Sequence, residues 1–155
     1  MIRKMHLEDI EHVCALEQKI FSQPWRQSDF EYELSENPFA YYWVYEYHHE
    51  VIAYLGFWVD ENHIQITTLG VDQNYRKKGY AKALMEHLFE YASKHSIDAI
   101  SLEVRESNVK AIHLYQSYGF KKAAIRQQYY SHPEEDGILM LCDMKGDLIH
   151  ENISH

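Results

Sequence analysis

The sequence contains 155 residues, of which 46% are hydrophobic and 14% aromatic, and it carries a formal net charge of -9. This apolar content excludes an intrinsically disordered class, and a chain of ~100 to 200 residues usually forms one domain. The negative charge argues against direct binding to a nucleic-acid backbone and favours attraction of basic peptides or amines.

The first part of the chain predicts two helices. Between Leu7 and Phe21, residues at steps of three and four are mostly apolar, which is typical of an amphipathic helix. The segment SQPW interrupts this pattern. The next run, RQSDFEYEL, places Phe30 and Leu34 on one short apolar face, with Ser28 as a candidate N-cap. We therefore expect both helices to precede the first long strand.

A change of composition at Ala40 marks the start of a sheet. The runs AYYWVYEY, VIAYLGFWV and HIQITTLGV are rich in β-branched and aromatic residues. Polar breaks at residues 48–50 and 60–62 separate them. This pattern predicts three consecutive strands in a meander.

Helices and strands alternate in the second half of the chain. A helix follows YRKKGYA, then comes the strand DAISLEV, then a helix in SNVKAIHLYQSYGF, which predicts βαβ crossovers with parallel pairing. Ser107 or Asn108 can cap the start of that last helix. Gly119 can form the left-handed turn at its end, after which Phe120 would begin a strand. The runs KKAAIRQQYY and GILMLCDM predict a final hairpin.

These elements predict an α/β fold. We expect a mixed, mostly antiparallel sheet of about seven strands, antiparallel at its beginning and parallel at the crossovers, flanked by about four helices. A single domain should cover residues 1–145, with a loosely held C-terminal tail over residues 146–155. The charged N-terminal segment lacks an uninterrupted apolar core, so we expect no signal peptide and no membrane span.

The cysteines and histidines do not predict a metal site. Cys14 and Cys142 are far apart in sequence and outside any CxxC pair, which argues against a disulfide framework and against a zinc site. The 11 histidines include no HxH or HExxH pattern. We therefore expect no metal, and reduced thiols in the cytoplasm.

Residues 75–81, YRKKGYA, bring three cations and a glycine to the start of a predicted helix. The first N–H groups of a helix have no partner within it, so they bind anions such as phosphate. Gly79 and the small Ala81 would let the backbone approach a pyrophosphate closely. Arg76, Lys77 and Lys78 add positive charge around it. The turn is neither a Walker A loop nor a GxGxxG turn, and a solvated basic turn that only caps a core helix is the alternative.

The stretch VDQNYRKKGYAKALMEHL resembles the coenzyme A loop of the GCN5-related N-acetyltransferases (GNAT family), with Arg76, Gly79 and Ala81 at its defining positions. The segments LEVRESNVKAIHLYQSYGF, RQQYY and EDGILM are similar to those of family members that acetylate the N-terminus of a bacterial ribosomal protein. The resemblance covers the order of elements over nearly the whole domain. It implies the GNAT, or acyl-CoA N-acyltransferase, fold and an N-α-acetyltransferase that uses acetyl-CoA and no metal.

The resemblance also implies a role for each candidate site residue. Glu103 would be the general base, directly or through water, and Tyr115 would protonate the thiolate of coenzyme A. Backbone groups of residues 69–71 would pair with the pantetheine arm and polarise the thioester carbonyl. The implied coenzyme A contacts are Leu69, Gly70, Val71, Arg76, Lys77, Lys78, Gly79, Tyr80, Ala81, Lys82 and Asn108.

Each of these roles has an ordinary structural alternative. Glu103 could be a surface strand residue paired with Arg105 or a lysine. Tyr115 could be a core tyrosine, since the chain contains 13 of them. Asn108 could simply cap its helix, although capping and a cofactor contact can coexist.

Some positions depart from the family pattern or have two readings. Gly70 stands where an alanine is expected, which keeps the backbone role and permits a local bulge. Tyr80 replaces a usual aliphatic residue and Gln73 a usual proline. The QPW loop matches a segment near the acceptor site, or it only packs its tryptophan. Tyr129-Tyr130 could line the peptide entrance or pack on the final strand.

The acceptor implied by the resemblance is the N-terminal peptide of a basic ribosomal protein, which the negative net charge suits. Other acceptors are another protein N-terminus, a lysine or a small amine. A non-catalytic acyl-CoA-binding module is the alternative from a different functional class. We expect no direct contact with nucleic acid or membrane.

Overall fold

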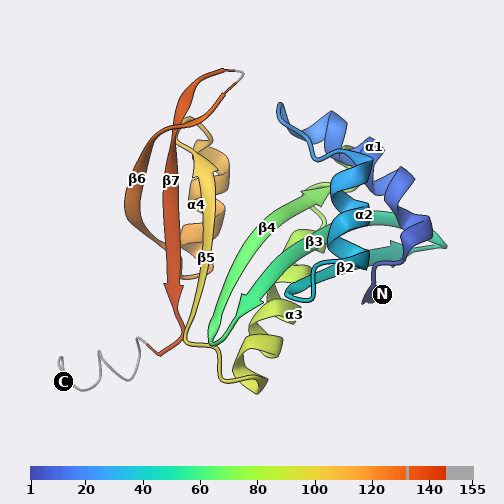
Figure 1. Ribbon diagram of the computed structural model, residues 1–155, viewed down its shortest axis with the longest axis horizontal. Coiled ribbons are helices and arrows are strands. Elements are labelled where there is room, and N and C mark those ends of the chain that lie inside the picture. Colours follow the sequence, from blue (N-terminus) through green and yellow to red (C-terminus); the bar gives the residue numbers. More distant parts are fainter. Residues whose placement is uncertain (132, 146–155) are drawn as a thin grey trace. The chain divides into compact units, whose positions relative to one another are not determined.

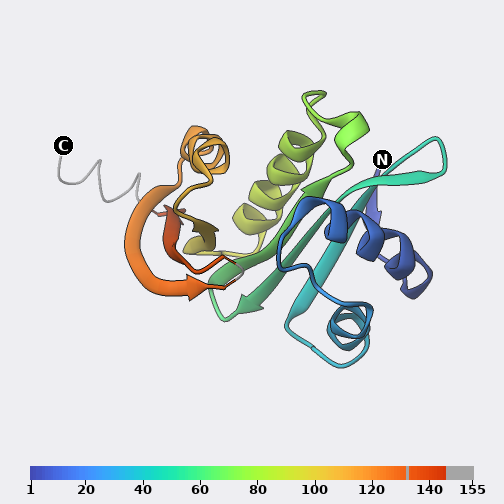
Figure 2. The same cartoon turned by 90° about the horizontal axis from the view of Figure 1, so that it is seen from above.

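The computed structural model describes residues 1–131 and 133–145. These residues form four α-helices, two short 3-10 turns and seven strands, and the strand order in the sheet is β1-β2-β3-β4-β5-β7-β6. They divide into two compact units (Figures 1 and 2). The first holds Met1–Val59 and Ile66–Tyr91, and the second holds Asp60–Gln65 and the described residues from Ala92 onward.

Most strands of the first unit follow the predicted meander. Their bounds are β1 (Ile2–Lys4), β2 (Ala40–Tyr47), β3 (Glu50–Asp60) and β4 (His63–Val71), whose first three residues belong to the second unit. Strand β2 pairs antiparallel with β1 and with β3. Strand β1 was not predicted, because three residues are too few to show the alternation that identifies a strand.

The helices of the first unit are α1 (Ile10–Ile20), α2 (Gln27–Ser35) and α3 (Tyr80–Lys94), whose last three residues belong to the second unit. A 3-10 turn at Leu7–Asp9 precedes α1. The first two predicted helices are therefore confirmed. The predicted N-cap of α2, Ser28, is wrong. The cap is Arg26, whose backbone N–H donates to Oδ2 of Asp29 at 2.8 Å, so the helix begins before Ser28.

Alternation along β2 directs its side chains to two different layers. Tyr42 and Val44 are buried in the apolar cluster that α1 and α2 complete. Trp43 lies on the other face, with its ring centroid 4.4 Å from that of His87 on α3. Figure 2 shows α3 on the opposite side of these strands from α1 and α2. The sheet of the first unit is therefore covered on both faces.

The second unit contains β5 (Ala99–Arg105), α4 (Val109–Ser117), β6 (Lys121–Tyr130) and β7 (Glu135–Asp143). The beginning of β4 pairs parallel with β5, which confirms the parallel crossover through α3. Strands β5 and β6 are each antiparallel to β7. They are thus parallel to one another, but the later strand β7 lies between them.

The ends of α4 resolve two open predictions. Asn108, not Ser107, is the N-cap, because its Oδ1 accepts the backbone N–H of Ala111 at 3.2 Å. Gly119 has φ +99°, which confirms the left-handed turn. Phe120 is buried, and β6 begins one residue later than predicted.

The predicted tail at residues 146–155 lies outside the described residues, and a single domain over residues 1–145 stays a prediction. Among the helices that the structure describes, none is both long and apolar enough to cross a membrane. The fold class is confirmed: the described strands form a mixed, mostly antiparallel sheet of seven strands with four α-helices.

Candidate active site

The basic turn connects β4 to α3 within the first unit. Asp72 caps the short 3-10 turn Gln73–Tyr75 by accepting the backbone N–H of Asn74 at 3.0 Å. The carbonyl of Gly79 then accepts the N–H of Ala83 at 2.9 Å and begins the hydrogen bonding of α3. The N-terminus of α3 therefore lies a few residues after the end of β4.

Gly79 is required by backbone conformation rather than by crowding. Its φ is +88°, in the region that residues with a Cβ rarely adopt. A Cβ built at this position would meet no atom within 4 Å, so the space above the turn is open. Lys77 also has a positive φ of 63°, which costs about 1–2 kcal/mol for a residue with a side chain. This backbone leaves the start of α3 accessible to a ligand.

Four cations surround this turn: Arg76, Lys77, Lys78 and Lys82, and all four residues are exposed. The Nε of Arg76 donates to the carbonyl of Val71 at 3.3 Å, and Nζ of Lys78 lies 5.7 Å from the centroid of the Tyr75 ring. Positive side chains and unpaired helix N–H groups both favour an anion. The turn can therefore hold a diphosphate at its exposed surface.

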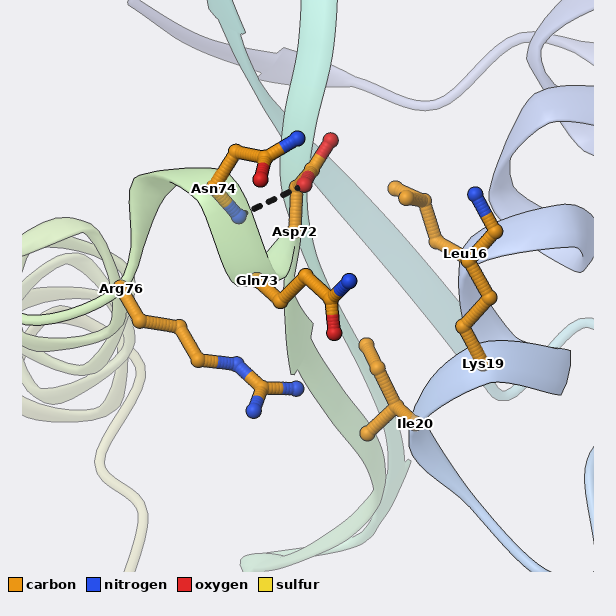
Figure 3. Close-up of a pocket in the computed structure, with 7 residues that line it drawn as sticks. All are labelled: Leu16, Lys19, Ile20, Asp72, Gln73, Asn74 and Arg76. Atoms are coloured by element: carbon orange, nitrogen blue, oxygen red, sulfur yellow. Dashed lines mark hydrogen bonds between the residues drawn. The ribbon is translucent and has the colours of Figure 1, made fainter.

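A small hollow adjoins the turn on the side of α1 (Figure 3). Its volume is about 60 Å³. Figure 3 shows the side chains of Gln73 and Arg76 reaching from the turn toward Ile20. The lining residues are Leu16, Lys19, Ile20, Asp72, Gln73, Asn74 and Arg76. This hollow has room for a few water molecules but not for a nucleotide, so a large anion would lie over the open face of the turn.

The end of β4 supplies the predicted backbone contacts, Leu69, Gly70 and Val71. Gly70 is buried, and a Cβ at this position would lie 2.5 Å from Oη of Tyr54. Such a contact is too short for any alanine without movement of the tyrosine. The glycine that departs from the expected pattern is therefore explained by the phenol of Tyr54, a partner that the sequence did not reveal.

Glu103 lies on β5 in the second unit, where it pairs with Leu139 of β7. Its side chain is only 10% exposed, and its Oε2 lies 2.6 Å from Nε of Arg126 on β6. The suggested pairing with Arg105 is wrong, because the guanidinium of Arg105 is bound to Glu135, with Nη1 and Oε1 3.2 Å apart. Sequence reasoning missed Arg126 because its pairing with Glu103 depends on the final hairpin.

Two tyrosines at the end of β6 flank this carboxylate differently. Burial raises the pKa of Tyr129, and the charge of Glu103 and a hydrogen bond to it raise it further. The ring of Tyr130 stacks under the guanidinium of Arg105 at 4.6 Å, and burial raises its pKa to about 12. Tyr129 is half exposed and can meet a ligand. Tyr130 is half-buried and packs against Arg105.

Tyr115 and Asn108 both lie at α4 of the second unit. The Tyr115 ring centroid is 5.7 Å from that of Phe120. Burial raises the pKa of the Tyr115 phenol, with smaller contributions from Tyr118 and Tyr130. Tyr115 therefore stays protonated at neutral pH, as a general acid must before it acts. Asn108 performs its capping role, and its contact with a cofactor stays a prediction.

The candidate residues thus fall into two groups, one in each unit. Residues 69–71 and 76–82 belong to the first, and Glu103, Asn108 and Tyr115 belong to the second. In residues 1–131 and 133–145, no group of three or more His, Cys, Asp or Glu side chains could hold a metal ion. Both cysteines are buried free thiols, and burial raises the pKa of Cys14, which disfavours its use as a thiolate nucleophile.

Comparison with known proteins gives consistent matches over nearly the whole chain. Residues 10–120 match the model of the acetyltransferase (GNAT) family. A Bacillus subtilis (strain 168) protein, provisionally named a [ribosomal protein bS18]-alanine N-acetyltransferase, is 36% identical over 139 residues, covering 90% of this chain and 92% of that protein. The Escherichia coli (strain K12) protein named [ribosomal protein bS18]-alanine N-acetyltransferase is 30% identical over 141 residues, covering 90% and 94%.

A solved structure agrees with these relatives. The crystal structure of the ribosomal-protein-S18-alanine N-acetyltransferase from Escherichia coli superposes with a TM-score of 0.85 at 29% identity. The match covers 93% of each chain. The similarity therefore extends to the arrangement of the elements as well as to the sequence.

Proposed function

Because the chain belongs to the acetyltransferase (GNAT) family and is an N-acetyltransferase, we propose that it transfers acetyl from acetyl-CoA to the N-terminal amine of a ribosomal protein. The acceptor we favour is the N-terminal alanine of bS18, which the names of its relatives specify. This is an activity of the RimI type. The observation that carries the proposal is the open basic turn ahead of α3, with Gly79 at φ +88°.

The turn would hold the diphosphate of coenzyme A. The N–H groups at the start of α3 supply hydrogen bonds, and Arg76, Lys77 and Lys78 supply charge. The strand end Leu69–Val71 would pair with the pantetheine arm, as an added strand pairs with a sheet edge. A backbone N–H of the same segment would polarise the thioester carbonyl.

The amine must lose its proton before it can attack the thioester carbon. An α-amine with a pKa of ~7.7 to 8.0 is roughly a tenth neutral at pH 7, whereas a lysine at ~10.4 is less than a thousandth neutral. An N-terminal acceptor therefore demands less of the base. Glu103 would take the proton released by the amine, directly or through water.

Arg126 has a defined part in this proposal. It neutralises Glu103 at 2.6 Å, yet its own side chain is about half exposed, at 49%. A cationic amine that approaches Glu103 would compete with Arg126 for this carboxylate, because the guanidinium side of the pair is open to solvent. When the C–S bond breaks, Tyr115 would give its proton to the departing thiolate. The amine nitrogen then carries the acetyl group.

We place the acceptor peptide against the loop before α2. A hollow of about 330 Å³ there is lined by Trp25, Asp29, Tyr32 and Glu33. The carboxylate of Asp29 beside two aromatic rings suits a basic peptide, and the net charge of -9 has the favourable sign. We propose the cytoplasm as the compartment, because both cysteines are free thiols and the proposed acceptor is ribosomal.

The acceptor is tested by incubating the chain and acetyl-CoA with a peptide that carries the first residues of bS18. We expect a mass gain of one acetyl group, located on the terminal amine by fragmentation. The control is the same peptide with a blocked N-terminus and a free lysine. Modification of the control alone would show a lysine acetyltransferase, and failure of every terminal peptide would reject the proposed acceptor.

The catalytic roles are tested separately. Glu103→Gln should lower kcat by about 10²-fold or more, the usual contribution of a general base. Binding of coenzyme A, measured by calorimetry, should stay unchanged because the basic turn is intact. Glu135→Gln is the matched control on the same face of the hairpin, since Glu135 binds Arg105. Equal turnover in the Glu103 variant and in wild type would contradict its role as base.

A further inference from the structure

The first unit buries a carboxylate that the proposed chemistry does not use. Glu17 on α1 is only 2% exposed. Its Oε1 accepts the hydroxyls of Tyr54 at 2.7 Å and Thr68 at 3.0 Å, and its Oε2 accepts the backbone N–H of Trp25 at 3.1 Å. All three donors are neutral, and burial raises the pKa of Glu17 despite them. A buried acid held by neutral groups is costly, so a purely apolar core would be the simpler solution.

The three donors come from three different segments. Trp25 belongs to the loop before α2, Tyr54 to β3 and Thr68 to β4. Thr68 directly precedes the Leu69–Val71 segment. One carboxylate is therefore bonded both to the loop beside the proposed acceptor and to the strand beside the proposed thioester.

Tyr54 extends this connection to Gly70. The Oη that donates to Glu17 is also the atom that would lie 2.5 Å from a Cβ at position 70. Tyr54 is fully buried, so its ring has little freedom to move. The Gly70 backbone consequently packs against the phenol of Tyr54, and Glu17 holds that phenol in place.

We propose that Glu17 is a positioning residue for acetyl transfer: through Tyr54 and Thr68 it fixes the Leu69–Val71 strand, and through Trp25 it fixes the loop before α2. This inference rests on the proposed function. In it Glu17 touches neither the amine nor the thioester and acts only through these neighbours. A displacement of about 1 Å at a reacting group can reduce the rate about 10²-fold, so this bracing matters to turnover.

The test compares Glu17→Gln with Asp9→Asn. Asp9 is another buried carboxylate of the first unit, but it binds Arg3 at 2.8 Å and has no contact with β4 in the described interactions. Both variants should lower the melting temperature. At a temperature where both are folded, Glu17→Gln should lower kcat about 10-fold to 100-fold. Asp9→Asn should leave both kcat and the dissociation constant of coenzyme A near those of wild type.

A second pair of variants covers the case in which Glu17→Gln fails to fold. Thr68→Val removes the hydroxyl that donates to Glu17 and keeps the shape of the side chain, whereas Thr68→Ser keeps the hydroxyl. We expect Thr68→Val to lower kcat several-fold and Thr68→Ser to restore it. Wild-type kcat in Thr68→Val, or in folded Glu17→Gln, would overturn the positioning role.

The outcomes for the two proposals are distinguishable. If wild type acetylates a lysine or a small amine instead of a terminal peptide, the acceptor proposal fails, and the same variants are compared on the amine that is used. A wild type that transfers acetyl to no amine would overturn both the proposed function and the role of Glu17.

Discussion

At the scale of single residues, the surroundings of Tyr115, the proposed general acid, determine its protonation state. Burial raises the pKa of the Tyr115 phenol above its ordinary value of ~10. A raised pKa extends the protonated, proton-donating form to higher pH. Ionisation of Tyr115 should therefore not reduce turnover at any pH at which the enzyme is normally assayed.

This gives a prediction for the pH profile. With saturating substrates, wild-type kcat should show no decline from pH 8 to about pH 10, because Tyr115 remains protonated throughout this range. Tyr115→Phe should lower kcat at every pH in the range. The measurement is the initial rate of thiol release. A decline with a midpoint near pH 9 that disappears in Tyr115→Phe would show that the phenol loses its proton near pH 9, which would contradict a raised pKa.

Gly70 and Tyr54 form the second residue-scale prediction. Gly70→Ala should cost about 1–3 kcal/mol in the free energy of unfolding, the usual penalty for overpacking a buried site. In a Tyr54→Phe background the ring loses its bond to Glu17 and can move aside, so the added cost of Gly70→Ala should be smaller. Denaturant unfolding of the four proteins measures this coupling. Equal costs in both backgrounds would contradict the contact.

At the scale of elements, the sequence predicts a strand correctly where the signal lies within the strand's own residues. The predicted runs coincide with β2 and β4, because β-branched and aromatic content is a property of each segment itself. The three-residue β1 carries no such pattern and exists only by pairing with β2. The placement of β7 between β5 and β6 also depends on tertiary pairing, which no single segment encodes.

The candidate site shows the same division. Gly79 and the cations of the turn were predicted because their signal lies within seven consecutive residues. Arg126 was missed as the partner of Glu103, and Tyr54 as the reason for Gly70, since each pair is brought together only by strand packing. Glu17 lies within the predicted helix between Leu7 and Phe21, but the helical pattern does not reveal that its carboxylate bonds three other segments.

The start of α3 carries a prediction of its own. Replacing Lys77 or Lys78 by Gln should weaken coenzyme A binding about 2-fold to 5-fold each, which corresponds to about 0.3–1 kcal/mol for an exposed charge at a helix N-terminus. Lys94→Gln, at the far end of the same helix, is the matched control. Calorimetry measures the dissociation constants. Equal effects at both ends of α3 would show that the turn does not hold the diphosphate.

At the scale of the whole molecule, the two proposed substrates carry opposite charges and are attracted by different parts of the protein. The chain has a net charge of -9, while the cations of the turn form a local positive site for an anion. A basic acceptor would be attracted by the overall charge, and the anionic cosubstrate only by the turn. Long-range attraction between exposed charges mainly raises the rate of encounter, so it should affect kcat/KM more than kcat.

Varying the salt concentration should therefore show how much the attraction between the acidic protein and a basic acceptor contributes to kcat/KM. With acetyl-CoA saturating, kcat/KM for a terminal peptide rich in Arg and Lys should fall as salt rises from 0.05 to 0.5 M, because the screening length shrinks from more than ~10 Å to a few ångströms. The same peptide with its basic residues replaced by Gln should respond little, and kcat should change little for either. Initial rates at several salt concentrations provide the measurement. If both peptides lose kcat/KM to the same extent, the acidic surface does not select a basic acceptor.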